Sequence, residues 1–212
     1  RLYDRCEIET RYSCINDFSL SKNDWTFFDK VNPTSIEKRM NIFFEIAPSL
    51  AEKAIEDCIK NIYILKDFTH LITVSCTGLA APGLDILLLA KLDFNKNIHR
   101  SSINFMGCYA AIHALKQAND ICNANKDAKV LIVDVELCTI HFQQKYSMEN
   151  IASSLLFADG AAAVVVSNEI GLYQIEHFFT EVALQGLNDM AWQVSSHGFL
   201  MSLSTYVPEI IS

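Results

Sequence analysis

The chain has 212 residues, of which 50% are hydrophobic and 20% are charged, and its formal net charge is −8. This length and composition allow a substantial hydrophobic core in one or two domains. The acidic balance argues against nucleic acid or an anionic membrane surface as a partner. No apolar run is long enough to span a membrane and no signal peptide is visible, so we expect a cytoplasmic protein.

The chain contains seven cysteines, an odd number, and no two of them form a Cys-x-x-Cys pair. A disulfide scaffold is therefore not expected, and a reducing compartment fits better. The cysteines and the six histidines also lack the spacing of metal ligands. No Gly-rich dinucleotide fingerprint follows a predicted strand. The sequence therefore predicts neither a metal site nor a bound cofactor.

The first predicted element is a helix that follows the polar N-terminal segment 1–24. Thr34 is the expected N-cap, and Glu37 follows three residues later, as in a capping box. Apolar residues then recur at helical spacing as far as Ile55. Pro48 lies inside this pattern, and we expect it to kink or divide the helix.

Strands and helices alternate along the rest of the chain, and two strands are nearly continuous apolar runs of the kind covered on both faces. This alternation predicts an α/β layered core. Residues 192–203 are ambiguous, and 207–211 resemble a helix start. In chain order, we predict a strand at 68–75, a helix at 84–92, an extended run that ends at Gly107, a helix reaching about 123, a strand at 128–135, a helix at 148–156, and strands at 161–166 and 171–182.

Cys108 lies where a predicted strand, a turn containing Gly107 and a helix opened by small residues follow one another. At a helix N-terminus, N–H groups without intrahelical partners and the helix dipole both favour a thiolate. This setting makes Cys108 the candidate nucleophile. The alternative is an inert thiol, because free cysteine is among the most buried residue types.

Five segments resemble the chalcone synthase-like, or type III, polyketide synthases. The resemblance runs over nearly the whole chain, and it implies the thiolase fold, a layered α/β/α architecture rich in βαβαβ units, usually as a homodimer. The segments are Gly-Cys-Tyr-Ala at 107–110, Val-Ser-Cys-Thr-Gly-Leu-Ala-Ala-Pro-Gly-Leu-Asp at 74–85, Val-Glu-Leu-Cys-Thr at 135–139, Leu-Phe-Ala-Asp-Gly-Ala-Ala at 156–162 and Ser-His-Gly-Phe at 196–199.

The resemblance also implies a reaction. Cys108 would take an acyl group from an acyl-CoA starter as a thioester, and malonyl-CoA would lose carbon dioxide to give an enolate that attacks it. A thiolate suits the first step and a thioester the second. The chain would then be an acyltransferase that builds a polyketide by decarboxylative Claisen condensation, with acyl-CoA and malonyl-CoA as substrates.

The resemblance divides the chain into a condensing domain at 1–170, which is mostly the first thiolase half, and the start of a second half at 171–212. The chain begins without Met and stops inside a predicted helix, so we expect an incomplete domain. In this family a His and an Asn of the second half stabilise the enolate, and none of the six histidines here has that position. We therefore expect little or no condensing activity from the chain alone.

Further residues acquire roles from the resemblance. His141 is expected to be a wall residue of the acyl pocket, with a His bonded to a backbone carbonyl as the alternative. Met201 stands where the family has a gatekeeper Phe. The more flexible Met side chain would make the pocket entrance more adaptable. Pocket-wall positions are implied for Cys76, Thr77 and Cys138, and a position at the junction of tunnel and pocket is implied for Phe157. Contacts with the CoA phosphates are implied for Arg1 and Arg5.

Two other classes of function stay open. One is another thiolase-fold condensing enzyme, such as a ketoacyl-ACP synthase III or a hydroxymethylglutaryl-CoA synthase, although Tyr109 directly after the cysteine and the Pro-Gly-Leu-Asp loop at 82–85 favour the polyketide branch. The other is a non-catalytic half-subunit that only binds acyl-CoA. An α/β-hydrolase-like cysteine enzyme is disfavoured, because no Gly-x-Ser-x-Gly analogue is present.

Overall fold

The structure is a computed structural model that describes residues 8–28 and 31–203. It contains two compact units, each described by itself. The sheet unit comprises Phe44–Glu136 and Gly160–Phe179. The hairpin unit comprises Arg1–Phe43, Leu137–Asp159 and Thr180–Ser212. No helix among the described residues is both long and apolar enough to cross a membrane.

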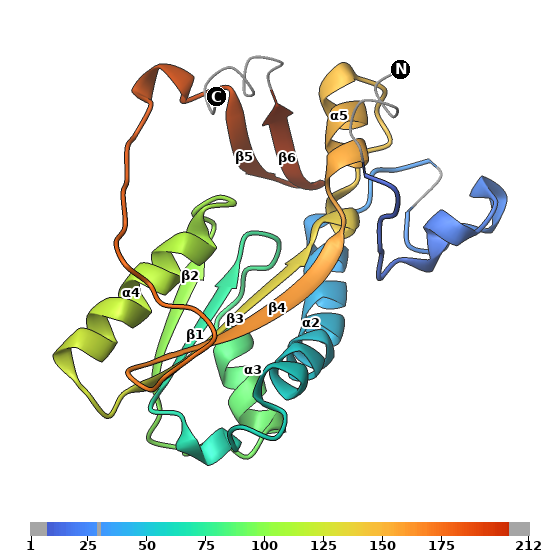
Figure 1. Ribbon diagram of the computed structural model, residues 1–212. Coiled ribbons are helices and arrows are strands. Elements are labelled where there is room, and N and C mark those ends of the chain that lie inside the picture. Colours follow the sequence, from blue (N-terminus) through green and yellow to red (C-terminus); the bar gives the residue numbers. More distant parts are fainter. Residues whose placement is uncertain (1–7, 29–30, 204–212) are drawn as a thin grey trace. The chain divides into compact units, whose positions relative to one another are not determined.

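A four-stranded sheet in the order β2-β1-β3-β4 forms the centre of the sheet unit (Figure 1). β1 (His70–Ser75) is parallel to both of its neighbours, β2 (His99–Asn104) and β3 (Lys129–Leu137). β4 (Asp159–Ser167) lies beside β3 at one edge. Parallel neighbours need crossover connections, and helices provide them here. The predicted α/β layered fold is confirmed.

Helix α4 (Ala110–Ala124) covers one face of this sheet through a stripe of small residues. Ala110, Ala114 and Ala118 recur every four residues, which is the spacing of one helix face. They are fully packed against alternate residues of β1 and β3, such as Ile72 and Ile132. Small side chains let the helix backbone approach the sheet closely, which fixes where the first turn of α4 lies.

Helices α3 (Leu84–Lys91) and α2 (Ile36–Ile59) lie on the other side of the sheet (Figure 1). α2 is one uninterrupted helix, so Pro48 does not divide it, and the alternative of a kink stays a prediction. Its N-terminus is also capped differently, because the hydroxyl of Ser35 accepts the Lys38 N–H at 3.2 Å. The Thr34 hydroxyl instead donates to the Phe27 carbonyl.

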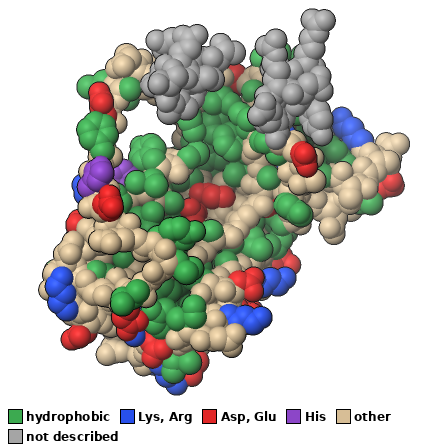
Figure 2. Space-filling model, viewed as in Figure 1, with side chains coloured by type: hydrophobic (Ala, Val, Ile, Leu, Met, Phe, Trp, Pro, Cys, Tyr) green, Lys and Arg blue, Asp and Glu red, His purple; other side chains and the backbone are tan. Residues whose placement is uncertain are grey.

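The predicted strand at 171–182 is absent from the described structure. Leu172 and Tyr173 are 95% and 93% exposed, so the apolar alternation there has no surface to pack on. An extended segment becomes a strand only when a neighbour pairs with its backbone groups. Large hydrophobic side chains are exposed elsewhere too, and Figure 2 shows such areas on one face.

The hairpin unit contains β5 (Met190–Ser195) and β6 (Gly198–Leu203), which pair antiparallel and resolve the ambiguous 192–203 segment. Helix α5 (Met148–Leu156) has the predicted bounds and is N-capped by Ser147. A short 3-10 helix, η4 (Cys138–His141), follows β3. The predicted helix start at 207–211 lies outside the described residues.

Arg39 is the largest fully buried side chain of the hairpin unit, with 2% of its surface exposed. Its guanidinium donates to the carbonyls of Thr34, Ile140 and Phe142. Burial lowers its pKa to about 10. The side chain thus ties the chain before α2 to both ends of the segment that carries His141.

Candidate active site

The turn around Cys108 has an unusual backbone. Phe105 and Gly107 have positive φ angles of 57° and 108° after β2 ends, and α4 begins at Ala110. A Cβ on Gly107 would lie 3.0 Å from the Tyr109 ring, so both the φ angle and the space favour glycine. Cys108 stands exposed at this turn, one residue before the N-cap Tyr109. The predicted succession of strand, glycine turn, cysteine and helix is confirmed.

Three parallel strands end at the same edge of the sheet and bring distant residues to this turn. Cys76 follows β1 directly, and its sulfur accepts the Gly107 N–H at 3.1 Å. Glu136 lies near the end of β3, where its carboxylate accepts the Cys76 N–H at 2.7 Å and the Thr77 hydroxyl at 2.5 Å. Ligand sites of parallel α/β sheets are built at this carboxyl edge.

Two acidic groups of β3 dominate the electrostatics below the turn. Burial raises the pKa of Glu136 to about 7 and that of Asp134 to about 6. Asp134 Oδ1 is buried with no hydrogen-bond partner among the described residues. Both carboxyls therefore titrate close to neutral pH. The sequence analysis did not predict these raised pKa values.

The thiol of Cys108 does not have the lowered pKa that the helix N-terminus predicts. Partial withdrawal of the sulfur from water raises its pKa, the negative charge of Glu136 adds to the rise, and Asp134 contributes in the same direction. Its own backbone N–H acts in the opposite direction but does not prevail. The described surroundings therefore raise the pKa of Cys108, because desolvation of the sulfur, together with the nearby carboxylates, outweighs the helix terminus.

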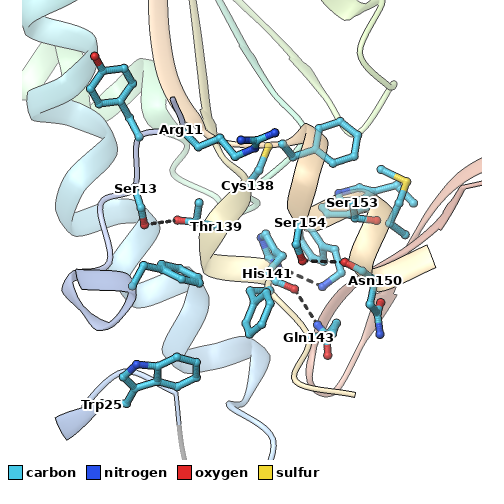
Figure 3. Close-up of a pocket in the computed structure, with 17 residues that line it drawn as sticks. Arg11, Ser13, Trp25, Cys138, Thr139, His141, Gln143, Asn150, Ser153 and Ser154 are labelled. Atoms are coloured by element: carbon cyan, nitrogen blue, oxygen red, sulfur yellow. Dashed lines mark hydrogen bonds between the residues drawn. The ribbon is translucent and has the colours of Figure 1, made fainter. Parts of the chain in front are cut away.

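A separate cavity of about 440 Å³ lies within the hairpin unit (Figure 3). Cys138, His141, Phe157 and Met201, which the sequence analysis placed in a substrate pocket, all line it. Its remaining walls come from the N-terminal segment, α5, the hairpin and the chain after η4. Aromatic side chains among them include Trp25, Trp192 and Phe199. Cys76 and Thr77 instead belong to the sheet unit, next to the Cys108 turn.

His141 is held as a rigid wall of this cavity. Its Nδ1 accepts the Phe199 N–H at 3.1 Å, and its ring stacks on the Phe199 ring with centroids 4.1 Å apart. The Trp192 ring meets it edge-on at 5.6 Å. The alternative, a His that bonds to a backbone carbonyl, does not describe Nδ1, which accepts from a backbone amide.

The sequence analysis missed Asp134, Glu136, Trp192 and Phe199 as site residues. A usable signal for the first two is that each is a charged residue within an otherwise apolar strand. Arg1 and Arg5, the expected CoA-phosphate contacts, lie outside the described residues. Within residues 8–28 and 31–203, no group of three or more His, Cys, Asp or Glu side chains could hold a metal ion.

Comparison with known proteins identifies the family of the chain. The family model for the N-terminal domain of chalcone and stilbene synthases matches residues 1–169. Over its full length the chain is 27% identical to an alpha-pyrone synthesis polyketide synthase-like protein of Mycobacterium tuberculosis, of which it covers 55%. Three quarters of the chain is 32% identical to type III polyketide synthase A of Arabidopsis thaliana, covering 40% of that protein.

Solved structures of similar proteins have the same fold as this chain. The whole chain superposes with a TM-score of 0.86 and 26% identity on the C-terminal type III polyketide synthase domain of Steely1, a type I/III hybrid from Dictyostelium. It covers 59% of that domain's chain. The chain thus spans about half the length of the curated relatives described above, and it matches their N-terminal part.

Proposed function

The chain belongs to the chalcone and stilbene synthase family, whose N-terminal domain it carries, and from that premise we propose that Cys108 is the acyl-carrying nucleophile of a polyketide-forming condensation. The observation that carries the proposal is the exposed thiol on a glycine turn at the carboxyl edge of a parallel sheet. We propose that residues 1–170 form the condensing domain and that residues 171–212 are the start of the second half.

The proposed first step joins the Cys108 sulfur to the carbonyl carbon of an acyl-CoA and releases CoA as its thiol. Malonyl-CoA then loses carbon dioxide, and the resulting enolate attacks the thioester carbon, which breaks the carbon–sulfur bond and releases the Cys108 thiolate. The thiol proton must leave before the first step. Because partial desolvation and the charge of Glu136 raise the pKa of Cys108, this chain alone should acylate slowly near pH 7 and faster as the pH rises.

The cavity of the hairpin unit supports a role in holding the acyl group or the growing chain. Its aromatic walls offer apolar surface, and Cys138 and Met201 add polarisable sulfur. We propose that His141 and Phe157 shape this pocket without taking part in proton transfer, since His141 Nδ1 is engaged by a backbone amide. Arg1 and Arg5 remain the proposed contacts for CoA phosphates.

Intact-protein mass spectrometry after incubation with acyl-CoA thioesters of different length tests the nucleophile. We expect one adduct per chain, absent in Cys108→Ala and retained in the control Cys58→Ala, with a rate that increases from pH 7 to pH 9. A folded wild-type chain that stays unmodified up to pH 9, or an adduct that survives Cys108→Ala, would contradict the assignment.

Radiolabelled malonyl-CoA, added to the acylated protein, separates the remaining alternatives. A stable adduct without extension supports a chain that loads but does not condense. Robust polyketide product would show that the chain needs no further residues for the enolate step. A single condensation that requires an acyl carrier protein would instead favour the ketoacyl-ACP synthase-like alternative.

We also propose that two copies of the chain associate near the Cys108 turn. β2 is an edge strand of the sheet, and exposed apolar side chains flank the turn that follows it, namely Leu79, Met106, Tyr109 and Ile112. An unpaired edge beside exposed apolar residues is typical of an association surface. Sedimentation equilibrium should give the mass of two chains, reduced to one in Ile112→Asp but not in the control Ile62→Asp. A monomer at all concentrations would overturn the proposal.

A further inference from the structure

A second free thiol, that of Cys76, packs against the turn that carries Cys108. The Cys76 sulfur accepts the Gly107 N–H at 3.1 Å and lies 3.5 Å from the Gly107 carbonyl oxygen. Cys76 follows β1 and the turn follows β2, and these parallel strands stay in register up to the pair Ser75 and Asn104. The sheet therefore holds both thiols at one edge. The proposed condensation gives the Cys76 thiol no chemical role.

The contacts with Gly107 limit the separation of the two cysteines. Standard bond lengths place a peptide oxygen about 2.8 Å from the next Cα, so the Cys76 sulfur lies within about 6 Å of the Cys108 Cα. In a disulfide, the corresponding distance is about 4 Å. A change of χ1 rotamer moves a cysteine sulfur by about 3 Å, which covers the remaining distance.

The two thiols also share an electrostatic environment. Partial burial raises the pKa of both, and the negative charge of Glu136, which accepts the Cys76 N–H at 2.7 Å, raises both further. Cys108 itself adds to the raised pKa of Cys76, an effect that requires the two sulfurs to be close in space. A disulfide carries no charge, so these surroundings tolerate it better than two thiolates.

We propose that Cys108 and Cys76 form a reversible disulfide when the chain meets a peroxide. Cys108 is exposed, so its thiolate attacks one peroxide oxygen and becomes a sulfenic acid, while the other oxygen leaves as hydroxide. The thiolate of Cys76 then attacks the sulfenic sulfur and displaces a second hydroxide. With the two thiol protons, the hydroxides become two molecules of water, so one peroxide is reduced and one S–S bond forms.

The other two cysteines of the sheet unit are held elsewhere. Cys122 lies near the far end of α4, where its sulfur donates to the carbonyls of Ala128 and Val166. Cys58 belongs to α2, on the opposite side of the sheet from α4 (Figure 1). Cys76 is thus the thiol of this unit that is placed to react with an oxidised Cys108.

The disulfide would protect the acyl-carrying sulfur from irreversible oxidation. Sulfinic and sulfonic acids form when a sulfenic acid meets further peroxide before a thiol does. While the S–S bond lasts, Cys108 cannot take an acyl group, and reduction restores it. This consequence for activity rests on the proposed function, whereas the formation of the disulfide does not.

Peptide mapping after treatment with hydrogen peroxide tests the disulfide. Trypsin places Cys76 in the peptide 67–91 and Cys108 in the peptide 101–116, and each peptide contains a single cysteine. After oxidation at pH 8.5 and alkylation of the remaining thiols, we expect these two peptides to be linked and dithiothreitol to separate them. The intact chain should lose two hydrogen atoms in mass. Oxidation should be slower at pH 7, because both thiols have a raised pKa.

Two serine variants assign the partner. Cys76→Ser keeps an acceptor for the Gly107 N–H, and it should accumulate at least about threefold more sulfinic or sulfonic acid at Cys108 than the wild type. The control Cys58→Ser removes another half-buried thiol and should behave like the wild type. Oxidation of Cys108 without a link to 67–91, or a link to another cysteine, would overturn the proposal. The wild-type map decides this even if the Cys76 variant does not fold.

Acylation of the same samples separates this proposal from the proposed function. Uptake of an acyl group from acyl-CoA should be lost on oxidation and return after reduction in the wild type, but not return in Cys76→Ser. A reduced chain that takes up no acyl group would contradict the proposed function and leave the peptide link unaffected.

Discussion

Replacing Arg39 by alanine is expected to lower the free energy of unfolding by about 4 kcal/mol. The substitution removes the donors that satisfy the carbonyls of Thr34, Ile140 and Phe142, and it leaves a cavity where a fully buried side chain was. Equilibrium urea denaturation, followed by circular dichroism, measures the change. A loss below about 1 kcal/mol would show that these hydrogen bonds contribute little.

Two matched variants separate the sources of this effect. Arg39→Met keeps most of the volume and removes the buried charge, so it should cost about half as much as alanine. Glu37→Ala, at an exposed position two residues earlier in the chain, should change stability by less than about 0.5 kcal/mol.

The contact between Arg39 and Gly198 offers a double-mutant cycle. Gly198 has a φ of 110°, and a Cβ there would lie 2.8 Å from Arg39 Nε. Gly198→Ala should therefore be strongly destabilising in the wild type and less so when Arg39 is already alanine. Additive effects would mean that backbone strain alone, and not the close approach of the guanidinium, requires glycine.

Replacing Glu136 by glutamine is expected to make the Cys108 thiol react roughly threefold to tenfold faster with iodoacetamide at pH 8. Glu136 has a pKa of about 7, so at pH 8 its negative charge opposes thiolate formation at Cys108. Glutamine keeps an acceptor for the Cys76 N–H and a partner for the Thr77 hydroxyl. The alkylation rate should therefore report the charge and not a collapsed site.

Two further acidic residues serve as controls for this measurement. Asp134→Asn should accelerate alkylation less than Glu136→Gln, since Asp134 contributes less to the raised pKa of Cys108. Asp120→Asn, on the exposed part of α4, should have no effect. Equal acceleration by all three variants would point to the net charge of the protein instead of the two buried carboxyls.

The same Glu136 variant should change how stability depends on pH. The folded-state pKa of about 7 lies above the ordinary value of 4.5, so ionisation of Glu136 disfavours the folded state as the pH rises between these values. Glutamine cannot ionise, and its advantage over the wild type should grow from pH 5 to pH 8. Denaturation midpoints at both pH values measure it, and a constant difference would contradict the raised pKa.

Much of the local structure could be predicted from the sequence. Helix α5 has the predicted bounds because an N-cap serine precedes a short amphipathic run, and β1 and β3 follow their apolar runs closely. The turn at Gly107 and Cys108 was also predictable, since glycine supplies the positive φ that other residues avoid. These are short-range effects, and a few neighbouring residues carry all the information.

Long-range pairing accounts for the predictions that failed. The segment 171–182 alternates like a strand but has no described neighbour to complete its hydrogen bonds, and α2 continues through Pro48 because its apolar face is packed along its whole length. Thr34 resembles an N-cap in sequence, yet the nearby Phe27 carbonyl takes its hydroxyl. In each case the tertiary surroundings, and not the local pattern, decide: a missing strand partner at 171–182, a packed helix face around Pro48, and a competing carbonyl at Thr34.

Some properties of Cys108 could be predicted from the sequence, and others depend on the tertiary structure. The sequence by itself determined that residue 108 is a thiol at the start of a helix, and that the chain resembles a family in which this cysteine carries the acyl group, whereas the structure showed that the thiol is exposed. Only the strand order β2-β1-β3 decided that Glu136 and Asp134, more than 25 residues away in sequence, lie close enough to raise its pKa. Electrostatic effects depend on distance through space, and the fold sets that distance.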